Sequence, residues 1–156
     1  MHETVREFGE LTSFLSYVKT LSDETFFAPI SPGKWSIAAI VTHIRFWDEF
    51  MLEQRLPYIC EGAQLPKAQL DIQQVNKHAE TYAHSGVSKM QLLEEACLYR
   101  QKVVAMLQKK DLRASFSIGD KKMTLEDYVR KEIEHDQHHI EQIKNHVEHV
   151  TMPYNI

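Results

Sequence analysis

Residues 124–150, TLEDYVRKEIEHDQHHIEQIKNHVEHV, decide the fold. Thr124 is a natural N-cap with Asp127 three residues later, and Pro153 ends the segment. The intervening positions that recur every three or four residues, the spacing of one helix face, are Val129, Ile133, Asp136, Ile140, Ile143 and Val147. The stretch therefore predicts one long amphipathic helix, with Asp136 as a hydrogen-bonding group on its buried face.

Three further segments show the same periodicity, and each is bounded by residues that begin or end helices. They are residues 3–22, residues 36–55 with an end at Arg55 or Pro57, and residues 88–110, which Ser88 caps. A short extra helix is expected over residues 71–82, a loop over 61–70, and an extended loop or small hairpin over 112–123. This pattern predicts an all-α four-helix bundle, forming a single domain over residues 1–150 with a tail at 151–156.

The composition narrows the class of protein. The 156 residues have a formal net charge of -4 with scattered basic residues, which argues against a nucleic-acid surface. No apolar run reaches the roughly 20 residues that cross a bilayer, and the N-terminus lacks an apolar leader. We therefore expect a cytoplasmic protein with no membrane partner. Cys60 and Cys97 lie far apart without a C-x-x-C spacing, so two free, buried thiols are expected.

Histidines are the most unusual feature of the sequence. There are 9 of them in all, and the last predicted helix is rich in them. At roughly 100° per residue, His138 and His149 point toward the outer face of that helix. The residues that share one flank of its apolar stripe are His135, His139 and His146, with Tyr128, Glu132 and Gln142.

His135 and His139 are four residues apart, which places their Cβ atoms roughly 5–6 Å apart on a helix. That spacing suits two imidazoles on one divalent metal ion. His43 lies on the flank of the second predicted helix, between Ile40 and Trp47, and a buried histidine there needs a partner. His43 is therefore the candidate third ligand. Three neutral nitrogens would leave positions open for water or substrate, the pattern of a catalytic site.

Each of these histidines also has a purely structural explanation. An isolated H-x-x-x-H is more often solvated, a lone histidine on an apolar face is more often a satisfied core residue, and His78 and His84 are interpreted as surface residues. The segment 135–139 also resembles the H-E-x-x-H helix of zinc proteases. The metzincin continuation, however, requires glycine and histidine where this chain has Gln142 and Asn145. No phosphate-binding loop, G-x-G-x-x-G or G-x-S-x-G motif is present.

Two motifs resemble the DinB-like (also called YfiT-like) superfamily of metalloproteins. Trp35-Ser36 followed by Thr42-His43-Ile44 is similar to the start of its second helix, and residues 135–143, HDQHHIEQI, are similar to its last helix. The resemblance extends over about residues 1–150. It implies an up-down-down-up bundle, a divalent metal such as zinc or nickel held by His43, His135 and His139, and a homodimer. Relatives include bacillithiol- and mycothiol-dependent S-transferases.

Three functions remain as alternatives, and whether the protein is an enzyme stays open. The first is a metal-dependent thiol S-transferase acting on small molecules, in which the metal holds a low-molecular-weight thiol as thiolate. The others are a metal-dependent hydrolase and a non-catalytic metal-binding stress-response protein. Glu132, one turn before His135, is a candidate general base or hydrogen-bond acceptor behind the ligands, and could equally be a surface residue. Trp47 and Tyr128 are candidates for a cavity wall or for the core.

Overall fold

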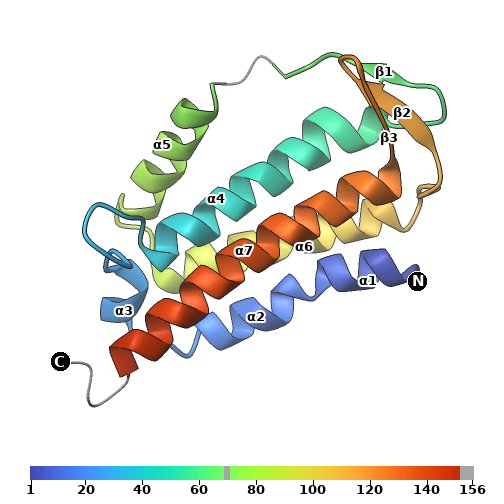
Figure 1. Ribbon diagram of the computed structural model, residues 1–156. Helices are drawn as coiled ribbons and strands as arrows, with labels where there is room; N and C mark the ends of the chain where they lie inside the picture. Colours follow the sequence, from blue (N-terminus) through green and yellow to red (C-terminus); the bar gives the residue numbers. More distant parts are fainter. Residues whose placement is uncertain (69–70, 152–156) are drawn as a thin grey trace.

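The protein is a bundle of four helical rods, and the computed structural model describes residues 1–68 and 71–151 (Figure 1). The rods are α1 (Glu3–Gly9) followed by α2 (Leu11–Val18), then α4 (Ile37–Phe50), α6 (Lys89–Leu107) and α7 (Leu125–Thr151). In Figure 1, α4 and α6 run in one direction, whereas α1–α2 and α7 run in the other. The all-α four-helix bundle, in up-down-down-up order, is therefore confirmed.

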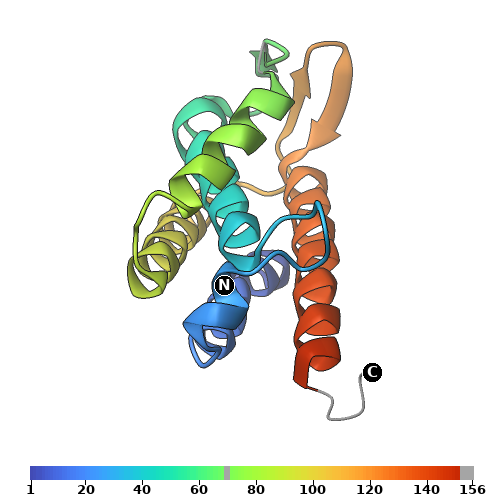
Figure 2. The same ribbon diagram turned by 90° about the vertical axis from the view of Figure 1, so that its left-hand side faces the viewer.

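Smaller elements cover the ends of the bundle. They are α3 (Asp23–Phe27), α5 (Ile72–Ala83), β1 (Gln64–Leu65), β2 (Ser115–Ile118) and β3 (Lys121–Thr124). Figures 1 and 2 show α5 beside α4 and inclined to it, and the three strands together at one end of α7. β2 and β3 form the hairpin expected over residues 112–123, while β1 pairs with β2 in parallel. The loop prediction for residues 61–70 missed β1, whose partner is distant in sequence; residues 69–70 are outside the described residues.

α7 begins where its capping residues predict. The backbone N–H of Asp127 donates to Thr124 Oγ1 at 3.1 Å, and the Asp127 carboxylate accepts from the Thr124 N–H at 3.4 Å. These two bonds satisfy backbone donors that the first helical turn leaves without partners. The helix then continues to Thr151, and residues 152–156 of the expected tail lie outside the described residues.

The prediction of a single helix over residues 3–22 is wrong in one respect, because the segment is divided at Glu10 into α1 and α2. Around the division the backbone forms i to i+3 bonds, from Glu10 N to Glu7 O at 3.1 Å and from Ser13 N to Glu10 O at 3.0 Å. Gly9 is a poor helix former, and a Cβ there would lie 3.5 Å from Val104 of α6. The break is thus a tight turn at Glu10, beside a residue of low helix propensity.

α4 does not end as an ordinary helix. It passes into a π-helical turn, η1 (Met51–Arg55), and then a 3₁₀ turn, η2 (Leu56–Tyr58), which contains Pro57. The wider π turn is a local departure from the 3.6-residue repeat, of the kind often found at functional sites. It brings the chain out of α4 with Arg55 turned toward the interior, where Arg55 is 6% exposed.

The interior consists of two apolar clusters joined by buried charge. One surrounds Ile40 and Ile143, and the other surrounds Leu56 and Val129. Cys97 is half-buried, whereas Cys60 is exposed, so the expectation of a buried Cys60 is wrong. Cys60 lies in the turn between η2 and β1, where Ile59 and Ala63 pack inward instead. Both thiols are free, and no helix in the described ranges is long and apolar enough to cross a membrane.

Candidate metal centre

Two histidines from neighbouring helices face each other across the α4–α7 contact. The rings of His43 on α4 and His139 on α7 have centroids 5.1 Å apart and planes inclined at 70°. Both line a cavity of about 330 Å³, and His135, one turn earlier on α7, lines it too. The structure thus brings the three predicted ligands to one cavity. His146, which shares their flank in the sequence, does not line it.

An amide side chain orients each of the two facing rings. His43 Nδ1 lies 2.9 Å from Oδ1 of Asn76 on α5, and His139 Nδ1 lies 2.8 Å from Oε1 of Gln142. Amide oxygens only accept hydrogen bonds, so Nδ1 carries the hydrogen and Nε2 keeps its lone pair. Fixing the tautomer in this way is how proteins prepare a histidine to bind a metal ion.

The surroundings also keep these imidazoles neutral. Burial lowers the pKa of His43 to about 4, with the positive charge of a protonated His139 lowering it further, while the Asn76 bond acts in the opposite direction. Burial likewise lowers the pKa of His139. The rings of Trp35 and Trp47, with centroids 5.1 and 6.2 Å from that of His43, form part of this apolar environment. Neutral imidazole is the form that binds metals.

Glu132 lies inside the site rather than on the surface, which rules out the surface alternative. It is half-buried on α7 and lines the same cavity as the three histidines. Burial raises the pKa of Glu132 to about 7, and the negative charges of Asp136 and Asp48 raise it further, against the opposing charge of Arg100. A carboxyl group of this kind can exchange a proton near neutral pH.

A buried ion cluster forms the floor of the cavity. Arg100 of α6, which is 1% exposed, donates to Asp48 of α4 and to Asp136 of α7, with a shortest distance of 2.7 Å to each carboxylate. It also donates to the backbone oxygen of Phe8 at 2.8 Å. All five N–H groups of the guanidinium are therefore used. The cluster fixes α4 against α7, and with them the two faces that carry the histidines.

Comparison with known proteins bears on the family and the fold. A family model for the DinB superfamily matches residues 10–143. The chain belongs to the DinB superfamily. Among solved structures it is similar to YfiT from Bacillus subtilis, with 16% identity, 95% of this chain and 86% of that chain covered, and a TM-score of 0.66. YfiT is described as "a probable metal-dependent hydrolase with an unusual four-helix bundle topology". A search of curated proteins found no match.

The donor set of this DinB superfamily member fits a divalent metal ion. Two imidazoles that bind one tetrahedral metal through nitrogens at about 2.1 Å have ring centroids roughly 5 Å apart, close to the spacing of His43 and His139. Within residues 1–68 and 71–151, however, no three His, Cys, Asp or Glu side chains are grouped so as to hold a metal ion. His135 is exposed, so completing the set requires a rearrangement of at least one side chain.

Sequence reasoning missed the residues that support the histidines. Gln142 was placed on the correct flank of α7, three residues after His139, but without a role. Asn76 and Arg100 carry no local signal, since each acts on a residue more than thirty positions away. The expected burial of Asp136 is confirmed, and its partner is Arg100.

Proposed function

We propose that the chain binds a divalent metal ion, zinc or nickel, through His43, His135 and His139, and is a metal-dependent hydrolase of small molecules. The observation that carries the proposal is the pair of facing imidazoles, each oriented by an amide oxygen, in one cavity with a half-buried Glu132. The description of YfiT as a probable metal-dependent hydrolase supports the same reaction class.

The chemistry that a divalent ion supplies at a three-imidazole site is Lewis acidity, which lowers the pKa of water or a thiol and polarises a carbonyl. The protein's own groups do the rest. His43 and His139 present Nε2 lone pairs in fixed orientations. Glu132, with a pKa of about 7, takes the proton from the attacking nucleophile and returns it to the leaving group. Ile44, Trp47 and Ile72 provide apolar parts of the cavity wall.

A thiol S-transferase is the second candidate, and one observation favours it. Transfer requires room for two reactants, and a second cavity of about 620 Å³ shares Trp47 with the histidine cavity. Glu132 would then accept the proton of the thiol in place of that of water. Thiol dependence separates the two candidates, because hydrolysis proceeds without added thiol.

Metal content of protein purified without a histidine tag is the first test. We expect about one equivalent in the wild type, lost in His43→Ala and His139→Ala and retained in His149→Ala, which removes an exposed histidine from the same helix. An ester and amide panel is then assayed with and without bacillithiol and a chloro-aromatic acceptor. Lack of metal uptake by the wild type, even after reconstitution with zinc or nickel, would overturn the proposal.

Glu132→Gln tests the general base. We expect the rate of the metal-loaded variant to fall by about 10²–10⁴-fold and its rise with pH near 7 to disappear, with metal content unchanged. An unaltered pH profile would exclude Glu132 as the base. Metal binding without turnover on any substrate would support the non-catalytic alternative. The homodimer and the cytoplasmic location stay predictions; light scattering on the purified protein tests the first.

A further inference from the structure

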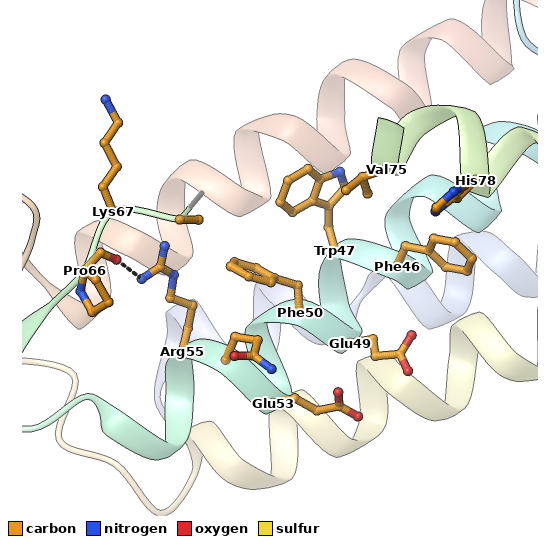
Figure 3. Close-up of a pocket in the computed structure, with 12 residues that line it drawn as sticks. Phe46, Trp47, Glu49, Phe50, Glu53, Arg55, Pro66, Lys67, Val75 and His78 are labelled. Carbon is orange, nitrogen blue, oxygen red and sulfur yellow. Dashed lines mark hydrogen bonds between the residues drawn. The ribbon is translucent and has the colours of Figure 1, made fainter. Parts of the chain in front are cut away.

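The second cavity has its own recognition chemistry. Figure 3 shows aromatic rings from α4 along one side and Arg55, at the end of η1, along the other. Its volume of about 620 Å³ lies within the range that holds small-molecule ligands. Trp47 lines both this cavity and the histidine cavity. A molecule bound here would therefore lie directly beside the candidate metal centre.

Arg55 is a buried cation without a matching anion. It is only 6% exposed, and among the described residues its one hydrogen bond runs from Nη1 to the backbone oxygen of Pro66 at 3.0 Å. No carboxylate in the described ranges lies within ion-pair distance of it. Arg100, the other deeply buried arginine, has every N–H group bonded. The other N–H groups of Arg55 are not among the fully shielded atoms that lack a partner, so solvent can reach them although the residue as a whole is buried. Because Arg55 lines the cavity, these donors are available to an anionic ligand that enters it.

The acidic residues of this cavity do not neutralise Arg55. Glu49 pairs with Arg45 at 3.2 Å and accepts a hydrogen bond from Tyr99 at 3.1 Å. Glu53 is exposed, and Figure 3 shows both carboxylates pointing away from the Arg55 guanidinium. The cavity therefore has one cationic end.

The wall beside Arg55 is aromatic. The guanidinium carbon lies 5.2 Å from the centre of the Phe50 ring, and the rings of Phe50 and Trp47 pack edge to face with centroids 5.7 Å apart. Such rings receive flat or apolar groups, and the planar guanidinium matches the two oxygens of a carboxylate.

We propose that this cavity binds a small organic molecule with an aromatic or apolar body and one carboxylate, the carboxylate on Arg55 and the body against Phe50 and Trp47. That the molecule is the substrate, with its reacting bond past Trp47 toward the histidines, rests on the proposed function. The binding of such a molecule in this cavity is independent of the proposed function.

A matched pair of ligands tests the proposal on metal-free protein. Calorimetry measures the affinity of 2-naphthylacetate and of its neutral amide after removal of metal with a chelator. We expect the acid to bind at least about tenfold more tightly, the difference that one charge-assisted hydrogen bond makes. Equal affinities for acid and amide in the wild type would overturn the proposal, and this comparison requires no variant to fold.

Variants then locate the two parts of the site. Arg55→Lys keeps the positive charge but loses the planar guanidinium. It should therefore weaken binding of the acid about tenfold and binding of the amide by less than about twofold. Phe50→Leu should lower the affinity for both ligands by the same factor. Arg113→Lys, at an exposed arginine outside this cavity, should leave both affinities unchanged. Acid preference that survives Arg55→Lys in a folded variant would contradict the assignment.

The His43→Ala variant separates this inference from the proposed function. Acid binding that persists in metal-free His43→Ala supports the Arg55 site whether or not the metal proposal holds. Acid binding that appears only in the metal-loaded wild type, and is lost in His43→Ala, would show that the metal centre holds the carboxylate. That result would overturn the Arg55 site and leave the metal proposal intact.

Discussion

Replacing Arg100 with methionine removes the one cation of the buried cluster that it forms with Asp48 and Asp136. Its five N–H groups are distributed over two carboxylates and one backbone oxygen, so all of these acceptors lose partners at once. Asp48 and Asp136 then remain buried close to each other without compensation. Breaking a buried pair in this way costs about 3–5 kcal/mol, a large part of the roughly 5–15 kcal/mol that stabilises a typical domain.

Urea unfolding followed by far-UV circular dichroism measures this loss. With a slope of about 2 kcal/mol per molar, the unfolding midpoint of Arg100→Met should fall by about 2 M. Burial already raises the pKa of Asp48 in the folded chain above its unfolded value. An acid whose folded pKa is raised lowers the free energy of unfolding as pH rises from its unfolded pKa to its folded pKa. Loss of Arg100 raises the folded pKa of Asp48 further and so widens that interval. The deficit should therefore be larger at about pH 8 than at about pH 5.

Two controls make the experiment decisive. Adding Asp48→Asn and Asp136→Asn to Arg100→Met removes the uncompensated charge, so the triple variant should be more stable than the single one. Arg130→Met removes a half-exposed arginine that pairs with Glu7 and Glu126, and should change stability by less than about 1 kcal/mol. A single variant within about 1 kcal/mol of wild type, or a triple variant no more stable than the single, would refute the reasoning.

Three further predictions concern α7. The pKa of Glu132 is about 7 in the folded protein against 4.5 for the free group, so its negative charge opposes folding above neutral pH. The melting temperature of Glu132→Gln should therefore exceed that of the wild type at about pH 8 but not at about pH 5. The reverse order would contradict the burial of Glu132. Gln142→Ala should weaken metal retention about 10–100-fold in a chelator competition, and unchanged affinity would show that the His139 ring needs no such support. Thr124→Ala should lower the free energy of unfolding by about 1 kcal/mol in urea, and no change would exclude a stabilising cap.

The long helices were accessible from sequence because their signals are local. Ser88 and Thr124 cap α6 and α7 as expected, through bonds that reach only three residues along the chain. The divided first helix was not accessible. Gly9 is the local signal at that break, and an isolated glycine is commonly tolerated within a helix.

The candidate site shows the same contrast between local and long-range signals. His135 and His139 could be paired from the helical repeat alone, and His43 could be added only as a candidate, yet all three line one cavity. The Gln142 bond to His139 is local, but the other groups that orient and support the site are not. Asn76 reaches His43 from α5, and Arg100 joins α4 to α7 from α6. Such partners depend on tertiary packing, which one sequence does not encode in its spacing.

The π turn at Met51–Arg55 makes this part of the chain sensitive to insertions and deletions. A π turn contains one residue more than the α-helical turn it replaces. Deleting a single residue there would let α4 continue as a regular helix and rotate each later side chain by about 100° around the axis. Arg55 would leave the cavity while Phe50 and Trp47 stayed in place. The same rotation would turn the fully buried Leu56 away from the apolar cluster that it shares with Val129. The length of this turn is therefore constrained by the cavity and by the core together.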